Sequence, residues 1–191
     1  MIGVGGPSGS SQRLFVAVPL PAELLEFVRA CQGLLPGQPG LRLMNAEQLH
    51  VTLAFIGEVD ERKADAARSV VRSIPAALGG ETTIERFLFI PSAKKARVVA
   101  LAISDAQGVF DRLFHLVMSG LEAADVMRRE KRPFRPHLTV ARLRNPGRVQ
   151  PRSESGTAPF AVESVCLYRS ELRREGAVYT ALEKTALTPG V

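Results

Sequence analysis

The sequence repeats one local pattern, first as His50-Val51-Thr52-Leu53-Ala54 and again as His137-Leu138-Thr139-Val140-Ala141. In both copies a histidine precedes a threonine by two positions, with apolar residues between and after them. Side chains alternate across a strand, so the histidine and the threonine share one face and the residue between them points to the other. The repeat therefore predicts two strands that each anchor one face in the core and present an imidazole beside a hydroxyl.

On either side of the two motifs, the sequence predicts short strands that come in pairs and three helices with an apolar stripe. Gly57 is expected to end the strand of the first motif, and Asp60 has a side chain suited to a helix N-cap. Because the strands cluster in pairs instead of alternating strictly with helices, we expect the α+β class with mostly antiparallel strands. The expected strands span residues 13–18, 49–55, 82–90, 97–103, 138–143, 162–168 and 177–182, and the expected helices span 22–35, 60–74 and 105–124.

A chain of 191 residues favours one compact unit over two independent domains. The Gly/Ser-rich opening predicts a disordered tail over residues 1–12, followed by a single domain over 13–191. Hydrophobic residues make up 46% of the chain, and no apolar run approaches the ~18 residues that a membrane helix needs, so we expect a soluble protein. Cys31 and Cys166 lie far apart in apolar settings, which indicates buried thiols in a reducing cytoplasm.

The formal net charge is +6 at pH 7, from 25 Lys and Arg against 19 Asp and Glu. Such a balance favours polyanionic partners such as nucleic acid, because phosphate contacts release condensed counterions. Many basic proteins bind no anion, so the charge supports a nucleic-acid partner without deciding it. The sequence contains no Gly-rich phosphate loop or dinucleotide fingerprint, which leaves P-loop and Rossmann nucleotide-binding folds without support.

Two imidazoles that face each other across a cleft suit phosphodiester cleavage without a metal. Histidine titrates near pH ~6.5, so one ring can stay neutral as a base while the other stays protonated as an acid. Threonine hydroxyls can donate to the non-bridging phosphate oxygens, where negative charge grows. A zinc site that uses both histidines is the rival, but no Cys, Asp or Glu lies at ligand spacing beside either one. The third histidine, His115, falls in a helical stripe and is expected to be structural or exposed, without a catalytic role.

The two motifs resemble those of the 2H phosphoesterase superfamily, which is named for its two His-x-Thr/Ser motifs. The closer resemblance is to the RNA 2′,3′-cyclic phosphodiesterases of the LigT type, also called 2′-5′ RNA ligases. The likeness covers most of the chain, and its segments follow the family order. The matching segments are residues 13–21 as the opening strand, 50–55 as the first motif, 134–142 as the second motif and 167–172 as a late strand end.

The resemblance implies a bilobal fold, in which two pseudo-symmetric lobes of mostly antiparallel strands with flanking helices surround a central cleft. It also implies hydrolysis of an RNA-terminal 2′,3′-cyclic phosphate to a 2′-phosphate and a free 3′-hydroxyl, with no cofactor and no metal. In that reaction His50 would protonate the 3′ oxygen, His137 would activate water, and Thr52 and Thr139 would hold the phosphate. The reverse reaction would join a 5′-hydroxyl in a 2′,5′ bond without ATP, because the strained ring supplies the driving force. The expected partner is RNA with a cyclic phosphate end, such as a tRNA half, and the expected state is a monomer.

Four further residues are candidates for substrate contacts, and most have a competing explanation. Arg142 follows its histidine by an odd number of positions, so a bulge or strand end is needed to turn it into the cleft, and a surface ion pair is the alternative. Arg135 and the basic run 128–132 could contact an RNA backbone or simply be solvated. Phe15 and Tyr168 could stack on a base, while core packing competes for Phe15 because it lies in an apolar strand.

Two rival functions stay open at this point. The same site could act on another substrate, such as cyclic ADP-ribose phosphate or 2′,5′-linked oligoadenylate, which a panel of substrates would separate. A noncatalytic RNA-binding module with a phosphate-binding cleft is the second rival, although binding alone would favour Arg or Lys over a repeated His-x-Thr.

Overall fold

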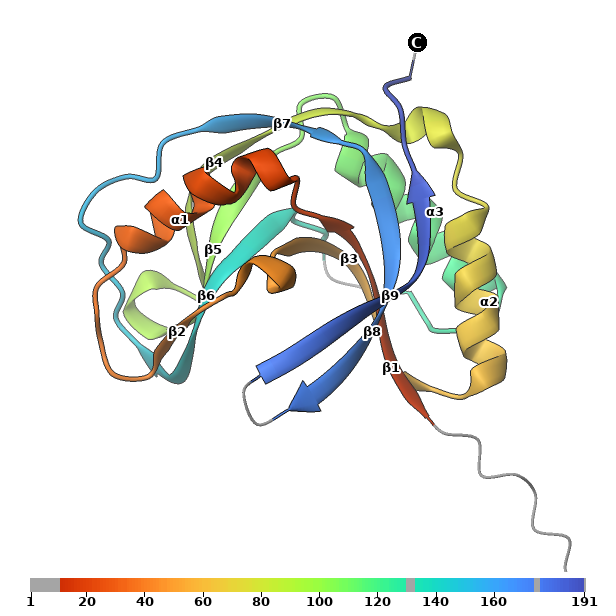
Figure 1. Cartoon of the computed structure of the whole chain (residues 1–191), viewed down its shortest axis with the longest axis horizontal. Coiled ribbons are helices and arrows are strands. Elements are labelled where there is room, and N and C mark those ends of the chain that lie inside the picture. Colours follow the sequence, from red (N-terminus) through yellow and green to blue (C-terminus); the bar gives the residue numbers. More distant parts are fainter. Residues whose placement is uncertain (1–10, 130–132, 174–175, 191) are drawn as a thin grey trace, which may run out of the picture.

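The computed structural model describes residues 11–129, 133–173 and 176–190, and it folds them into one strongly curved sheet with α-helices packed on it (Figure 1). The helices of this described part are α1 (Leu25–Gly33), α2 (Glu61–Arg72) and α3 (Val109–Ala123). Its strands are β1 (Gln12–Pro19), β2 (Leu41–Leu43), β3 (His50–Val59), β4 (Gly80–Ile90), β5 (Ala96–Ser104), β6 (His137–Gly147), β7 (Ala158–Val162), β8 (Ser164–Arg173) and β9 (Gly176–Ala186).

The sheet consists of two halves with the same plan. Its strand order is β7-β4-β5-β6-β3-β1-β8-β9, with β2 added on β6, and the strand pairs are antiparallel. One half starts at β6 and continues through β5, β4 and β7, while the other starts at β3 and continues through β1, β8 and β9. The halves meet where Val51 of β3 pairs with Leu138 of β6. The expected α+β fold of two pseudo-symmetric, antiparallel lobes is thus confirmed.

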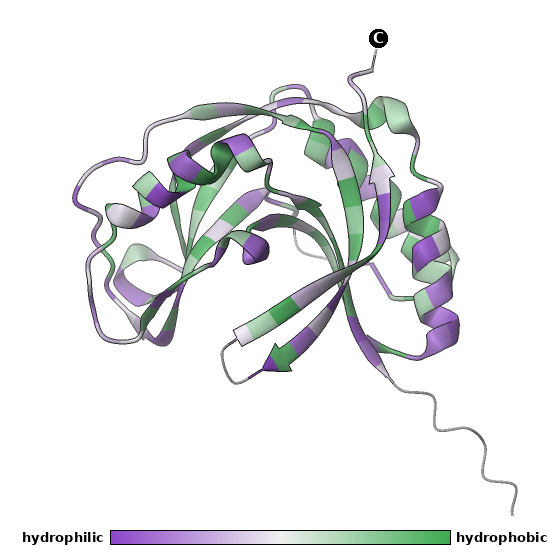
Figure 2. Cartoon of the chain, in the orientation of Figure 1, coloured by the Kyte–Doolittle hydropathy of each residue, from purple (hydrophilic) through white to green (hydrophobic). Residues whose placement is uncertain are grey.

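The helices cover the sheet through the apolar stripes that the sequence predicts. Residues Val109, Leu113, Val117 and Leu121 of α3 recur at helical spacing and are all fully buried. In α2 small buried residues face the sheet, whereas bands of hydrophilic residues lie along the rest of the helix (Figure 2). The Asp60 carboxylate accepts a hydrogen bond from the Lys63 backbone at 2.9 Å, which confirms the predicted N-cap of α2. In the described part of the chain, no helix is both long and apolar enough to cross a membrane.

Several predicted boundaries are wrong because they depend on contacts that a local pattern does not contain. Gly57 does not end its strand, since β3 continues to Val59 and Gly57 adopts a φ of +84° beside a bulge at Ile56. α3 begins at Val109 instead of residue 105, because the Asp105 carboxylate accepts hydrogen bonds from the backbone N–H groups of residues 110 and 111.

Other differences concern the sheet. The short strand β2 was not predicted, and β6 extends to Gly147 instead of ending at residue 143. The predicted strand 162–168 is divided, since β7 ends at Val162 and β8 begins at Ser164. β1 begins at Gln12, inside the predicted tail, and residues 1–10 of that tail lie outside the described part.

Candidate active site

The two histidine motifs lie side by side at the centre of the sheet. Val51 and Leu138 form an antiparallel pair, and both side chains are buried in the core. Extending this register by one residue places His50 opposite Thr139 and Thr52 opposite His137 on the other face. These four side chains line one cavity of about 400 Å³, which we call the motif cavity. The fold thus brings both His-x-Thr motifs to one site.

A bulge in each motif strand decides what lies beyond the threonine. In β6, Thr139 pairs with Ala100 and Ala141 pairs with Val99, so Val140 has no partner in that ladder. Val140 and Ala141 are consequently both buried, and the alternation resumes with Arg142 on the face of His137. Arg142 lines the motif cavity, so the bulge that its inward orientation requires is present.

The same irregularity occurs in β3. Ala17 of β1 pairs with Thr52 and Val16 pairs with Ala54, which leaves Leu53 unpaired. Phe55 then occupies the position that corresponds to Arg142, and it also lines the motif cavity. Because the bulge recurs at the same offset from the histidine, the two motifs match in backbone as well as in sequence.

A side chain of α1 fixes the bulge of β6. The buried amide of Gln32 donates to the carbonyl oxygens of Val140 and Met44, both at 2.9 Å. The backbone N–H of Met44 also donates to the Val140 carbonyl, at 2.9 Å. These bonds give the Val140 carbonyl hydrogen-bond partners at the point where the pairing of β6 with β5 is interrupted. They also hold the strand segment from which Arg142 projects.

Aromatic rings surround His50. Its ring centroid lies 4.8 Å from that of Phe15, 5.3 Å from that of Tyr179 and 6.4 Å from that of Tyr168. Burial among these rings disfavours the charged imidazole and lowers the pKa of His50 to about 4. A hydrogen bond with the main chain of Gln48 acts in the opposite direction, while the nearby charges of Arg142 and His137 lower this pKa further. His50 is therefore neutral at pH 7 when the cavity holds no anion.

His137 has a more open environment. Its Nδ1 lies 2.7 Å from the carbonyl oxygen of Arg135, two residues earlier in the chain. If Nδ1 donates this bond, the neutral ring keeps the lone pair of Nε2 available as a base. His50 also has a hydrogen bond with the main chain two residues earlier, at Gln48.

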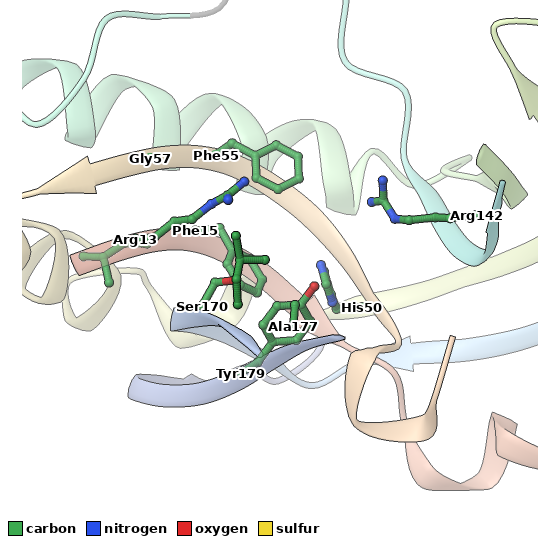
Figure 3. Close-up of a pocket in the computed structure, with 11 residues that line it drawn as sticks. Arg13, Phe15, His50, Phe55, Gly57, Arg142, Ser170, Ala177 and Tyr179 are labelled. Carbon is green, nitrogen blue, oxygen red and sulfur yellow. The ribbon is translucent and has the colours of Figure 1, made fainter. Parts of the chain in front are cut away.

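A second cavity of about 360 Å³, which we call the side cavity, adjoins the motif cavity on the β1, β8 and β9 side (Figure 3). It shares His50, Phe55, Arg142 and Tyr179 with the motif cavity and adds Arg13 and Ser170, but it does not reach His137. Among the described residues, no Asp or Glu lines either cavity. A site with arginines and histidines and no carboxylate favours a bound anion.

The other predicted site residues occupy different places. Arg135 lines the motif cavity and is exposed. Phe15 lines the side cavity, but it is only 3% exposed and its ring stacks on that of Tyr168 with the two centroids 5.2 Å apart, so it belongs chiefly to the packing around His50. Tyr168 lines neither cavity and lies behind Phe15. Of the basic run 128–132, residues 130–132 lie outside the described part, and Arg129 contacts His115 on α3. His115 is exposed and lines neither cavity.

The lining residues that the sequence prediction missed include Arg13, Gln48, Phe55 and Tyr179. Phe55 could have been found, because it stands at the same offset from its histidine as Arg142. Tyr179 lies on β9, far from both motifs in sequence, and only the pairing of β8 with β9 brings it to His50. In residues 11–129, 133–173 and 176–190, no three His, Cys, Asp or Glu side chains lie close enough together to hold a metal ion.

Known proteins resemble this chain over nearly its whole length. The family model of the 2′-5′ RNA ligase superfamily matches residues 20–174. The RNA 2′,3′-cyclic phosphodiesterase of Thermus thermophilus is 32% identical, over 92% of this chain and 90% of the relative. The enzyme of the same name from Escherichia coli K12 is also 32% identical, over 93% of this chain and 97% of the relative.

Solved structures agree with the sequence relatives. TT0787 of Thermus thermophilus has a TM-score of 0.81 at 30% identity, and the match covers 93% of this chain and 98% of that one. Escherichia coli LigT complexed with 3′-AMP has a TM-score of 0.79 at 31% identity, with 94% and 99% of the two chains covered. Sequence and fold therefore indicate the same family.

Proposed function

Since the chain belongs to the 2′-5′ RNA ligase superfamily, we propose that it is an RNA 2′,3′-cyclic phosphodiesterase that opens the cyclic phosphate at RNA ends by acid-base catalysis. The observation that carries this proposal is the convergence of both His-x-Thr motifs on one cavity that no described carboxylate lines. The curated relatives bear this activity in their names, and the structure of Escherichia coli LigT is of a complex with a nucleotide, 3′-AMP.

In the proposed reaction water attacks phosphorus and the bond from phosphorus to the ribose 3′ oxygen breaks. One imidazole takes a proton from the water, and the other gives a proton to the departing 3′ oxygen. The product is a 2′-phosphate with a free 3′-hydroxyl, and the two imidazoles exchange their protonation states during the reaction. A proton transfer through solvent restores them.

The hydroxyls of Thr52 and Thr139 donate to the non-bridging phosphate oxygens, as their position across from the opposite histidine suggests. Arg142 supplies a positive charge to the same anion, because the bulge at Val140 turns it into the motif cavity. Arg135 lines that cavity and is exposed, so it can contact the RNA backbone.

The proposed division of roles makes His50 the acid and His137 the base. The Nδ1 bond of His137 to the Arg135 carbonyl supports the second role, because it leaves Nε2 unprotonated in the neutral ring. His50 has a pKa of about 4 in the free protein, so it must gain its proton with the substrate. A cyclic phosphate beside the ring carries the negative charge that raises this pKa, since a nearby opposite charge favours the charged form.

Ligation opens the same cyclic phosphate with a different nucleophile. A 5′-hydroxyl replaces water, its oxygen attacks phosphorus, and a 2′,5′ phosphodiester forms as the 3′ oxygen departs. No nucleotide triphosphate is consumed, because opening the strained ring supplies the driving force. We propose this as a second activity of the same site, with RNA ends such as tRNA halves as substrates and a monomer, built on residues 13–191 as one domain, as the acting unit.

Hydrolysis of 2′,3′-cyclic AMP in excess EDTA tests the proposal. We expect turnover that survives chelation and yields 2′-AMP, identified by chromatography against 3′-AMP. Formation of 3′-AMP, or loss of turnover with EDTA and its recovery with a divalent metal, would contradict the mechanism. A panel with cyclic ADP-ribose phosphate and 2′,5′-linked oligoadenylate then separates this function from others that the same site could perform.

A noncatalytic role in RNA binding predicts a different result. A pure binding module would turn over none of these substrates while it retained affinity for an RNA end. The His50→Ala variant makes the distinction sharper, because an enzyme loses turnover in this variant but keeps the phosphate ligands Thr52, Thr139 and Arg142.

A further inference from the structure

The side cavity is lined by a positively charged side chain, that of Arg13, which has no role in the proposed reaction. Arg13 lies on β1 next but one to Phe15, so both side chains point to the same face of the strand. Arg13 is exposed, and the described residues give it no hydrogen bond or ion pair. In Figure 3 the guanidinium groups of Arg13 and Arg142 approach from opposite sides, with Phe55 between them.

The apolar part of the side cavity is also unusual. Phe55 is 56% exposed and Leu172 is 75% exposed, although both line this cavity. Large apolar side chains that remain this exposed at the edge of a cationic cavity provide a surface on which a nucleobase can stack. Ser170 adds a hydroxyl to the same wall.

The geometry points to a subsite for the second nucleotide of the RNA. We propose that the side cavity binds the nucleotide that precedes the cyclic phosphate end, with Arg13 on the phosphodiester 5′ of the terminal ribose and Phe55 against a base. This inference rests on the proposed function, because it assumes a cyclic phosphate between His50 and His137.

The position of the cavity supports this assignment. The side cavity touches His50 but not His137. If His50 protonates the 3′ oxygen, the terminal ribose lies on the His50 side, and the phosphodiester at its 5′ position continues away from His137. Arg13 stands about 7 Å along β1 from Phe15, which contacts His50, and this spacing is on the scale of one nucleotide.

Binding of two products tests the subsite independently of turnover. The ligands are 2′-AMP and the dinucleotide ApA with a terminal 2′-phosphate, each titrated into the wild type and into Arg13→Gln. We expect the wild type to bind the dinucleotide about tenfold more tightly, and Arg13→Gln to lose most of this preference, because one charge-assisted hydrogen bond to phosphate is removed. Arg13→Lys should retain much of it, since the charge remains.

Salt dependence provides a readout that a structural role would not change. One phosphate contact on a single strand adds about 0.7 to the slope of log affinity against log salt. Arg13→Gln should therefore reduce this slope by about that amount for the dinucleotide and not for 2′-AMP. The matched control is Arg62→Gln, which removes an exposed charge on α2, outside both cavities, and should alter neither ligand.

Three results would overturn the inference. The first is equal affinity of the wild type for the two ligands, and the second is an equal loss for both in Arg13→Gln. The third is a preference for the dinucleotide that Arg13→Gln leaves unchanged, which would assign the additional contact to residues other than Arg13. If instead 2′,3′-cyclic AMP is not hydrolysed, the proposed function fails, and the two binding titrations still decide the subsite.

Discussion

The two motif strands, β3 and β6, have the same local backbone conformation but different surroundings. Each carries a histidine, a threonine and a bulge at the same offsets, and each histidine bonds to the main chain two residues earlier. Their neighbours differ, because β3 lies beside β1 and its histidine packs among rings of β1, β8 and β9, whereas β6 lies beside β5 and the ring of His137 bonds to the carbonyl of Arg135.

This difference shows how a symmetric scaffold can support an asymmetric reaction. Acid and base catalysis in one step require one neutral and one protonated imidazole. Two identical rings in identical surroundings would titrate alike, so the fold must distinguish them. Burial does this for His50, and the residue at the fifth position after each histidine, Phe55 in one strand and Arg142 in the other, adds a second asymmetry.

Replacing either histidine of the two motifs should have the largest effect on the rate of turnover. We expect His50→Gln and His137→Gln each to lower kcat by about 10² to 10⁴, the contribution of one positioned acid or base. The pH profile assigns the roles, since loss of the acid removes the alkaline limb and loss of the base removes the acidic limb. The proposed roles predict that His50→Gln loses the alkaline limb. His115→Gln, on the exposed side of α3, should keep wild-type rates.

The burial of His50 should make the free energy of unfolding depend on pH. Its pKa of about 4 lies below the ordinary value near 6.5, so the unfolded chain binds more protons between these two pH values. The free energy of unfolding should therefore fall by up to about 3 kcal/mol as pH decreases from 6.5 to 4, at roughly 1.4 kcal/mol per pKa unit.

Urea unfolding across this pH range tests the effect. His50→Gln should lack this component, whereas His137→Gln should keep it, so the difference between each variant and the wild type isolates the buried ring. Parallel loss of stability in the wild type and His50→Gln would mean that His50 is not desolvated in solution.

Replacing Arg142 tests the second asymmetry, the difference between Phe55 in β3 and Arg142 in β6, and Arg142→Phe makes the two positions alike. Arg142→Gln and Arg142→Phe should each lower kcat/KM for 2′,3′-cyclic AMP by about 10- to 100-fold, because a hydrogen bond to a charged group contributes roughly 1.5–3 kcal/mol. Arg144→Gln on the same strand is the matched control, since Arg144 lines neither cavity. An equal loss in the Arg144 variant would indicate a general effect of charge instead of a contact in the cavity.

The smallest effect should come from the support of the β6 bulge. Gln32→Leu removes the amide that donates to Val140 and Met44, and it should lower the free energy of unfolding by about 1–2 kcal/mol. If the bulge orients Arg142, kcat/KM should also fall by a few-fold beyond any loss of folded protein. Thermal unfolding and rates of the remaining folded enzyme separate these two effects, and full activity would show that the strand holds its bulge without Gln32.

Features that depend on neighbouring residues in the chain could be predicted from the sequence. The Asp60 cap, the apolar stripe of α3 and the strands of both motifs follow from short-range patterns, and each is present. The meeting of the two motifs was predicted because a repeated polar pair on a strand has no packing advantage. The ends of β3 and β6 were not predicted, because a strand ends where its partner ends.

The sequence by itself therefore determined which residues share a face and that two histidines of one pattern belong to one site. Only the tertiary structure decided that Arg142 faces the cavity, that Tyr179 contacts His50 and that His50 is held neutral. These features depend on the register between strands and on burial by distant segments. A one-residue bulge reverses every later side chain, and the pKa of an imidazole depends on what surrounds it.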